Sequence, residues 1–337
     1  MVKEGWRENV PMLYEYLLEQ RYDAAAQLFN ICWNTASNTP ASKHQILYGT
    51  RNANTPRRPN DLITLANVRL PRNELEQWDN VQSHFQNRSS PTRRIKEAMS
   101  IQHPDRQLQA FGVLPSGGLV SAGHNQLYHY PSLNVSKQAH CSALVTPDTR
   151  PGPGLCVRVR SIVNGARDGR FMQYDLAQSR APAACSNVPS TDPVLIQDVD
   201  AHPSDNWFCG VTRCGRLLIW DRRHQQVDVP LPVDTFEYHA KAVNCVRWSP
   251  HLPNVYAAAS DDMSITLANV SKEPVGTTMD DTALFFRHFI HHAPVKRVAW
   301  HPQLRAVLTS VGAEGERRGS TVHVWKPNLW LAKSHVQ

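Results

Sequence analysis

The sequence predicts an all-β protein folded as a β-propeller, a ring of small antiparallel sheets. Three observations support this prediction: a strand end that recurs along the chain, a proline turn upstream of it, and alternating apolar and polar residues between turns. The 337 residues are 41% hydrophobic and 8% aromatic. That composition provides for a large core and excludes a wholly disordered chain.

The recurring strand end appears in five segments, most of which finish on an aromatic residue. The aligned positions are separated by 44, 46, 48 and 57 residues. They are Tyr130, Tyr174, Trp220, Ala268 and Trp325. A proline turn precedes four of them by 15, 17, 18 and 23 residues. These prolines are Pro115, Pro203, Pro250 and Pro302. Two signals that keep the same spacing indicate repeated units.

Each unit has the residue pattern of short strands joined by turns. Residues 243–248 alternate between apolar and polar side chains, which is the period of a half-buried strand. Asp261 and Asp262 are typical turn residues. Four short strands in about 40–45 residues are typical of a WD-repeat propeller blade. A β-sandwich is the alternative, but it gives no reason for the regular interval.

Blades of this type are tied together by a histidine, a hydroxyl residue, a turn aspartate and a terminal tryptophan. One unit keeps His239, Ser260 and Asp261 or Asp262, with Ala268 in place of the tryptophan. We therefore expect degenerate blades held mainly by apolar packing, and we interpret these polar residues as structural rather than catalytic.

Residues 1–43 are predicted to hold an N-terminal α-helix and its lead-in. Asn9 can cap a helix whose first turn contains Pro11, where the missing N–H does no harm. At helical spacing the apolar residues that follow form three stripes. The stripes are Met12 with Tyr16, Leu13 with Leu17, and Tyr14 with Leu18. A helix that is apolar on most of its surface must be covered on more than one side.

Residues 44–330 are predicted to form a single propeller domain. Residues 44–71 are expected to close the ring beside the last unit, because a strand from the other terminus removes open sheet edges. These N-terminal strands and the five downstream units make six recognisable blades. Residues 131–190 are proline-rich, and the repeat pattern is blurred there.

Charge, cysteine usage and hydropathy narrow the class of protein further. The net charge is +7, from 36 Lys and Arg against 29 Asp and Glu, and it is spread along the chain. The seven cysteines form no C-x-x-C pair, which argues against a zinc ribbon or a disulfide framework. The N-terminus is too charged for a secretory signal, and no apolar run approaches the ~18–20 residues that cross a bilayer. We expect a soluble protein of a reducing intracellular compartment, with no membrane partner.

Several segments together resemble one protein family. Residues 6–16 read Trp-Arg-Glu-Asn-Val-Pro-Met-Leu-Tyr-Glu-Tyr, and residues 44–50 and 62–71 form the next two matching segments. Asp221-Arg-Arg, Val243-Asn-Cys-Val and Trp248-Ser-Pro match later blades. These residues resemble the histone-binding WD-repeat proteins of the retinoblastoma-binding, chromatin-assembly-factor small-subunit type. The resemblance covers nearly the whole chain and marks it as a divergent member.

The resemblance implies seven blades and a side groove that clasps an amphipathic helix of histone three or four. Apolar residues would grip the helix, and carboxylates would pair with its Arg and Lys. The groove residues are Met12, Leu13, Tyr16, Leu17, Asp280, Asp281, Leu284, Phe285 and Phe286. A solvated turn is the alternative interpretation of Asp280 and Asp281.

The resemblance also implies a second site, an acidic mouth of the central channel that takes a basic peptide. Asn244 is the one mouth position that matches. Gln197 stands where the family has glutamate, and Gly152 occupies a less surely aligned glutamate position. With a net charge of +7 as well, the sequence argues against a basic tail at this mouth.

The motifs of the common catalytic classes are missing from the sequence. It contains no phosphate-binding glycine loop and no G-x-S-x-G elbow. His288, His291 and His292 form the one histidine cluster, but no nearby carboxylate or thiol completes a ligand set. We therefore expect no catalytic residues, no cofactor and no metal.

The functional hypothesis is a non-catalytic scaffold that binds core histones inside a chromatin-assembly or histone-modifying complex. Its expected partners are core histones and the other subunits of such complexes, and its expected location is the nucleus, with a cytoplasmic pool. The alternatives are a scaffold on RNA or ribonucleoprotein, which the positive charge favours, and a structural subunit without a ligand of its own.

Overall fold

The computed structural model describes eighteen stretches of the chain, and the structural statements below concern these residues. They are residues 13–22, 27–34, 44–51, 61–71, 95–105, 107–114, 117–124, 126–131, 142–144, 151–157, 161–166, 170–175, 182–187, 196–204, 207–221, 234–270, 284–313 and 319–328. Side chains are not described for 142–144, 151–154, 161–166, 170–175 and 182–187.

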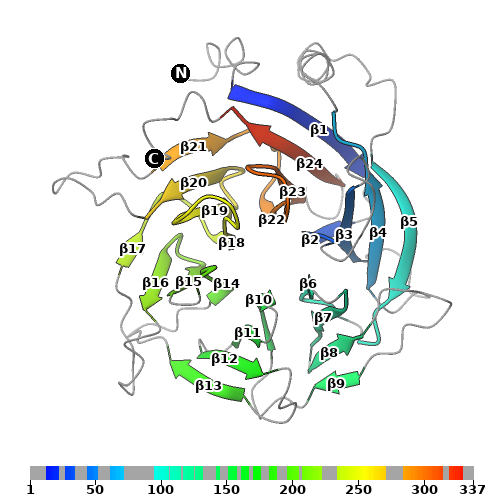
Figure 1. Ribbon diagram of the computed structural model, residues 1–337, viewed down its shortest axis with the longest axis vertical. Coiled ribbons are helices and arrows are strands. Elements are labelled where there is room, and N and C mark those ends of the chain that lie inside the picture. Colours follow the sequence, from blue (N-terminus) through cyan, green and yellow to red (C-terminus); the bar gives the residue numbers. More distant parts are fainter. Residues whose placement is uncertain are drawn as a thin grey trace.

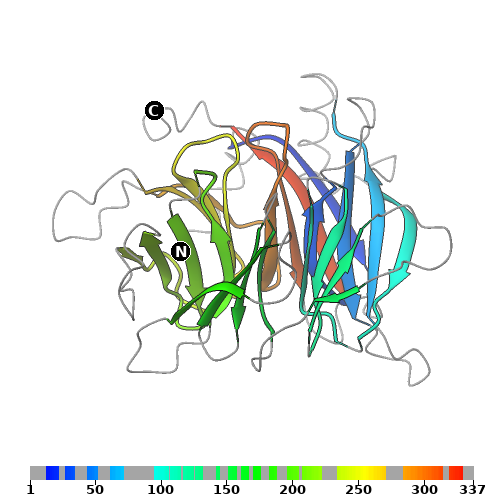
Figure 2. The same cartoon turned by 60° about the horizontal axis from the view of Figure 1, so that its bottom comes forward.

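The strands of the described stretches form six four-stranded antiparallel sheets arranged around a central axis (Figures 1 and 2). Each sheet is named here for its innermost strand. The innermost strands contact one another in the order β2, β6, β10, β14, β18, β22, and β22 contacts β2 again. The ring is therefore closed, and the end of its central axis where the innermost strands begin is called the channel mouth below.

Three sheets form the first half of the ring, in chain order. The β2 sheet contains β2 (Gln27–Trp33), β3 (His44–Arg51), β4 (Leu62–Val68) and β5 (Ile95–Gln102). The β6 sheet contains β6 (Ala110–Val113), β7 (Leu119–Ala122), β8 (Leu127–Tyr130) and β9 (Ser142–Leu144). The β10 sheet contains β10 (Pro151–Val157), β11 (Ser161–Ala166), β12 (Arg170–Asp175) and β13 (Pro182–Asn187).

The other three sheets complete the ring, and the last of them takes a strand from the N-terminal part of the chain. The β14 sheet contains β14 (Ile196–Ala201), β15 (Trp207–Thr212), β16 (Leu217–Asp221) and β17 (Asp234–Phe236). The β18 sheet contains β18 (Val243–Trp248), β19 (Val255–Ser260), β20 (Ile265–Asn269) and β21 (Leu284–His288). The β22 sheet contains β22 (Val295–Trp300), β23 (Leu308–Ala313), β24 (Ser320–Pro327) and β1 (Tyr14–Tyr22).

The predicted N-terminal helix is wrong over residues 14–22, which form strand β1. β1 pairs with β24, with Leu17 opposite Trp325, and a bulge follows Tyr14. Because of this bulge, Tyr14 and Leu17 pack between the β18 and β22 sheets, while Tyr16 and Leu18 pack between the β22 and β2 sheets. The apolar residues suggested a helix buried on several sides, but a strand covered on both faces needs the same composition.

The predicted boundary at residue 44 and the predicted closing segment also need correction. The range 1–43 contains strands β1 and β2 in addition to the residues that the structure does not describe. Residues 44–71 supply β3 and β4, the second and third strands of the β2 sheet, which lies beside the β22 sheet. The strand that closes the ring by backbone hydrogen bonds is β1.

The blurred region 131–190 contributes β9 and the whole β10 sheet. The six sheets of the described residues thus include a regular unit where the sequence pattern is weakest. The seventh blade implied by the family resemblance has no counterpart among them.

The predicted structural ties inside the blades are present. His239 on the approach to β18 contacts Asp262 Oδ2 through Nδ1 at 2.8 Å and Thr266 Oγ1 through Nε2 at 2.9 Å. The Ser260 hydroxyl donates to the Ala242 carbonyl at 2.9 Å. Of the two candidate turn aspartates, Asp262 is therefore the one that binds the histidine.

Within the described stretches, no helix combines the length and hydropathy needed to cross a membrane.

Candidate functional site

A row of bulged residues forms the channel mouth. Four innermost strands have a β-bulge near their start. In each bulge one residue is left out of the strand pairing, and its side chain is turned toward the mouth. These residues are Phe29 on β2, Gln197 on β14, Asn244 on β18 and Lys296 on β22. Two of them, Gln197 and Asn244, are the mouth positions that the sequence predicted.

The mouth leads into a cavity of about 590 Å³. Its lining comes mainly from the β2 and β22 sheets, with single residues from the β6, β14 and β18 sheets. The lining residues are Gln27, Leu28, Phe29, Arg51, Gln109, Gln197, Asn244, Pro294, Lys296, Arg297 and Ala313. Three of these side chains are cationic, and none of the described lining residues is a carboxylate.

Hydrogen bonds fix two of the bulged side chains. The Asn244 amide nitrogen donates to Asp261 Oδ1 at 2.6 Å and to the Val295 carbonyl at 2.9 Å. Lys296 Nζ donates to the same Asp261 oxygen at 2.7 Å. Asp261 therefore stands behind the mouth residues and orients them. The Arg51 guanidinium lies 4.8 Å from the centre of the Phe29 ring, in a cation–π contact.

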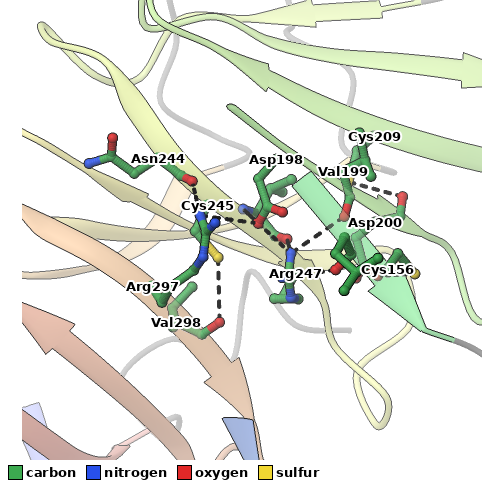
Figure 3. Close-up of polar contacts among 12 residues, drawn as sticks. Cys156, Asp198, Val199, Asp200, Cys209, Asn244, Cys245, Arg247, Arg297 and Val298 are labelled. Atoms are coloured by element: carbon green, nitrogen blue, oxygen red, sulfur yellow. Dashed lines mark hydrogen bonds and ion pairs between the residues drawn. The ribbon is translucent and has the colours of Figure 1, made fainter. Parts of the chain in front are cut away.

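A buried ion network connects three innermost strands and includes Arg297 of the cavity lining (Figure 3). Asp198 on β14 accepts a hydrogen bond from Arg247 on β18, and Arg297 on β22 lies 3.9 Å from the same carboxylate oxygen. Arg297 also donates to the Asn244 carbonyl at 2.5 Å. Burial opposes the charge of Arg247, but Asp198, Cys245, Asp200 and Cys156 together outweigh it and raise the Arg247 pKa. The network joins three neighbouring sheets through their innermost strands.

The thiols near this network are not reactive groups. Cys156 donates to Asp200 Oδ1 at 2.9 Å, and Cys209 donates to the Asp200 carbonyl at 3.5 Å (Figure 3). Burial raises the pKa of Cys245 to about 12. Burial, followed by the Asp200 charge, also raises the pKa of Cys209. Protonated buried thiols are poor nucleophiles and poor metal ligands.

The predicted histone groove is only partly within the described residues. Met12, Asp280 and Asp281 lie outside them. Tyr16 and Leu17 are 3% and 1% exposed, so they are core residues of β1 rather than the ligand-facing side of a helix.

The remaining groove residues lie where β1 and β21 meet at the rim. Leu13, Phe285 and Phe286 are half-buried and pack against the core cluster between the β18 and β22 sheets, whereas Leu284 packs against a different cluster, between the β14 and β18 sheets. Tyr14 touches Phe286 edge-on, with 5.5 Å between ring centres. The structure thus brings Leu13, Phe285 and Phe286 together, with Leu284 packed apart from them, and these three residues are called the side surface below.

The histidine cluster differs in membership from the predicted one. His323 joins His288 and His291, with one candidate ligand atom of each within 4.8 Å of the others, whereas His292 is exposed. His288 Nε2 and His323 Nδ1 are 3.2 Å apart and share a hydrogen bond. The His291 and His323 rings stack at 3.8 Å and 15°, so their in-plane lone pairs run side by side instead of converging. These contacts favour a structural cluster.

Two serine–histidine pairs have distances that suit a nucleophile and its base. His103 Nε2 is 2.8 Å from Ser121 Oγ, and His291 Nε2 is 2.8 Å from Ser310 Oγ. Both serines are completely buried, and Trp325 Nε1 also donates to Ser310. A substrate cannot reach either hydroxyl, so these pairs hold strands together.

Of the lining residues, sequence reasoning found only Gln197 and Asn244, and the polar residues that it missed include Gln27, Arg51, Gln109 and Lys296. Only Lys296 carried a usable signal, because it occupies the same place in its unit as Gln197 and Asn244, one residue after the start of the innermost strand. The other three depend on which sheets become neighbours.

Comparisons with known proteins support the repeat assignment. The model of the family described as WD domain, G-beta repeat, matches residues 231–268. These residues include β17 of the β14 sheet and then β18, β19 and most of β20, in the sheet where His239 binds Asp262. The fold is thus an all-β propeller of the WD-repeat type.

Curated relatives match the chain at low identity. Histone acetyltransferase type B subunit 2 of Candida glabrata is 21% identical over 327 residues, covering 92% of this chain and 72% of that protein. The APC/C activator protein CDH1 of Saccharomyces cerevisiae is 27% identical, over 34% of this chain and 18% of its own length. Meiotic fizzy-related protein 1 of Schizosaccharomyces pombe is 23% identical, over 50% of this chain and 36% of its own length. The chain thus spans well under two thirds of the latter two relatives.

Proposed function

We propose that this WD-repeat β-propeller is a non-catalytic scaffold that binds a core-histone helix within a chromatin-assembly or histone-modifying complex. The observation that carries the proposal is the similarity to a histone acetyltransferase subunit along 92% of the chain. The matches to the APC/C activator protein and to the meiotic fizzy-related protein cover half of the chain or less.

The side surface supports the proposal physically. Phe285 and Phe286 belong to β21, the outermost described strand of the β18 sheet, and they remain partly exposed, as does the preceding Leu284. Phe289, just beyond the strand, is 53% exposed. Apolar residues at an open sheet edge attract other chains unless a partner covers them. An amphipathic helix offers an apolar face that fits such a strip.

The charges next to the side surface determine which helix fits. Asp280 and Asp281 precede Leu284 by a few residues in the sequence. A helix with Arg and Lys beside its apolar face gains ion pairs with these carboxylates, and histone helices have this character. The expected partners are therefore core histones and the neighbouring subunits of a chromatin complex, and a nuclear location with a cytoplasmic pool follows from them.

The decisive experiment is titration of the purified protein with a core-histone helix peptide. Asp280→Lys with Asp281→Lys should abolish most of the binding, because losing a desolvated charge pair costs about 2–5 kcal/mol and reversal costs at least as much. Asp234→Lys with Glu237→Lys is the matched control. It makes the same change in net charge at exposed positions on and just after β17. If the two double variants bound the histone peptide with equal affinity, the proposed role of Asp280 and Asp281 in binding the helix would be refuted.

Salt dependence tests the RNA-binding alternative, which the net charge of +7 favours. A protein that neutralises phosphates loses affinity log-linearly and steeply as salt rises. A helix held by an apolar strip loses much less. The titration repeated at several salt concentrations, with a single-stranded RNA in parallel, therefore separates the two scaffolds.

A further inference from the structure

We infer that the channel-mouth cavity binds an acidic peptide segment, whose carboxylates lie over the β2, β6 and β22 sheets. This ligand and this surface differ from those of the histone proposal, so either can fail without the other. The inference rests on the charge of the lining, on donors without partners inside it, and on the shape of the site.

The charge of the lining is the first argument. Arg51 on β3, Lys296 on β22 and Arg297 beside it contribute three cations to one cavity of about 590 Å³. Lys296 is paired with Asp261 at 2.7 Å, and Arg297 lies 3.9 Å from the buried Asp198, but neither carboxylate belongs to the lining. Positive charge in a hollow with low-dielectric walls attracts an anion more strongly than the same charge on an open surface. A basic peptide would meet repulsion here.

Buried donors without partners are the second argument. The side-chain nitrogens of Gln27 and Gln109 are buried and have no hydrogen-bond partner in the described structure. Gln109 is only 9% exposed, and both residues line the cavity. Buried amide groups normally find a partner, so an orphaned donor that faces a cavity points to a ligand acceptor. Carboxylate oxygens are acceptors only, and they match these donors.

The donors and the cations occupy one side of the cavity. Gln27 and Arg51 are directly paired across β2 and β3, and Lys296 belongs to the neighbouring sheet. Gln109 comes from the β6 sheet on the other side of β2. Asn244 on β18 lies next to Lys296, and Gln197 on β14 lies one sheet further round the ring. The Asn244 side-chain nitrogen already donates to Asp261 and to the Val295 carbonyl, so a peptide backbone N–H could bind this side chain only through its Oδ1.

The aromatic residue of the cavity argues for a peptide over single-stranded nucleic acid. Bases bind such proteins by stacking on an open aromatic face. The Phe29 ring is the one aromatic group in the described lining, and the Arg51 guanidinium covers it. Gly49 presses on the same ring, since a Cβ there would lie 2.8 Å from Phe29 Cζ. The ring is therefore engaged by the protein itself and offers no stacking platform.

The test uses the full chain and a short fluorescent peptide of alternating aspartate and glycine. Two peptides of the same length, with asparagine or lysine in place of aspartate, serve as ligand controls. The aspartate peptide should bind at least about tenfold more tightly than the asparagine peptide, as expected for charge-assisted hydrogen bonds. Arg51→Glu and Lys296→Glu should each weaken it by about tenfold or more.

Arg305→Glu is the matched protein control. Arg305 is exposed in the turn after β22, at the far end of that strand from Lys296, and its reversal changes the net charge as much as Arg51→Glu. It should leave peptide affinity unchanged. If Arg305→Glu lost as much affinity for the aspartate peptide, net charge alone would explain the effect and the inference would be overturned. Equal affinity of the protein for the aspartate and asparagine peptides would also overturn it.

A third variant separates binding from folding. Gln109→Met removes the orphaned donor at nearly constant volume, so it should weaken the aspartate peptide several-fold while the melting temperature stays equal or rises. A fall in melting temperature with unchanged affinity would show that Gln109 serves the core alone and contradict the donor argument. Displacement of the peptide by poly(U) at lower concentration than by unlabelled peptide would overturn the inference in favour of an RNA site.

Discussion

The Asp198 carboxylate on β14 accepts a hydrogen bond from the Arg247 guanidinium on β18, and this buried ion pair joins two neighbouring sheets. The Asp198 side chain is 0% exposed. Arg247 also donates to the Val199 carbonyl at 3.4 Å and to the Leu155 carbonyl at 3.4 Å, so its charge is solvated by the innermost strands of two sheets. Removal of one partner leaves the other as an uncompensated buried charge.

Asp198→Ala should therefore lower the free energy of unfolding by about 3–5 kcal/mol. Urea unfolding followed by tryptophan fluorescence measures this value. Glu237→Ala is the control, because Glu237 pairs with Arg216 at 2.8 Å with side chains that are 47% and 55% exposed. Its cost should stay below about 1 kcal/mol. Similar values for the two variants would mean that water reaches Arg247.

The sequence could predict the ring because the units repeat locally. The same turn follows three innermost strands. In this turn the side chain of the residue before proline accepts a hydrogen bond from the backbone N–H of the residue after proline. His202 accepts from Ser204, Ser249 from His251, and His301 from Gln303. The sequence showed this turn at Pro203, Pro250 and Pro302, so local chemistry alone identified these units.

The N-terminal strand could not be predicted, because its decisive contacts are distant in sequence. Tyr14 and Leu17 fit an amphipathic helix and a doubly buried strand equally well, and the pattern of a short apolar run cannot distinguish them. The segment becomes a strand because it pairs with the open edge of β24, about three hundred residues further along the chain. For the same reason, the sequence did not show that His323 belongs to the histidine cluster or that Arg51 lines the cavity.

His301 should make the stability of the fold sensitive to acid. Its Nδ1 accepts the backbone N–H groups of Gln303 at 3.0 Å and Leu304 at 2.9 Å, and its Nε2 contacts His44 Nδ1 at 2.9 Å. These contacts need the neutral ring with its proton on Nε2. Burial first, and then the nearby His44 and His251 rings, lower the His301 pKa from 6.5 to about 3.

The sign of the pH effect follows from linkage. Between pH 6.5 and about 3 the unfolded chain binds a proton at His301 and the folded chain does not, so stability falls as the pH drops. The loss should reach at most about 1.4 kcal/mol per pH unit. His301→Gln should flatten the stability profile below pH 6.5, whereas substitution of the exposed His292 by Gln should leave its slope unchanged. Urea unfolding at a series of pH values measures both, and identical slopes would contradict this role of His301.

The histidine cluster should contain no stoichiometric metal in the purified protein. The Tyr14 hydroxyl contacts His288 Nδ1 at 2.7 Å, and the Trp325 ring stacks on His288 at 4.4 Å, so ligation would break a packed arrangement. Elemental analysis and melting with and without a chelator measure this. About one zinc per chain, together with a lower melting temperature in the chelator, would show instead that His288, His291 and His323 reorient around an ion.

Strand β1 should stabilise the whole ring, because it fills the open edge of the β22 sheet and contributes to cores on both sides. Leu17 is 1% exposed and lies opposite Trp325. Leu17→Asp removes its apolar contacts and buries an unpaired carboxylate, so it should cost about 4 kcal/mol or more and promote aggregation through the freed edge of β24. Arg21→Asp, on the same strand with a side chain 73% exposed, should cost less than about 1 kcal/mol. Thermal melting and size-exclusion chromatography compare the two. If Leu17→Asp proved as stable and monomeric as Arg21→Asp, the chain would close its ring without β1.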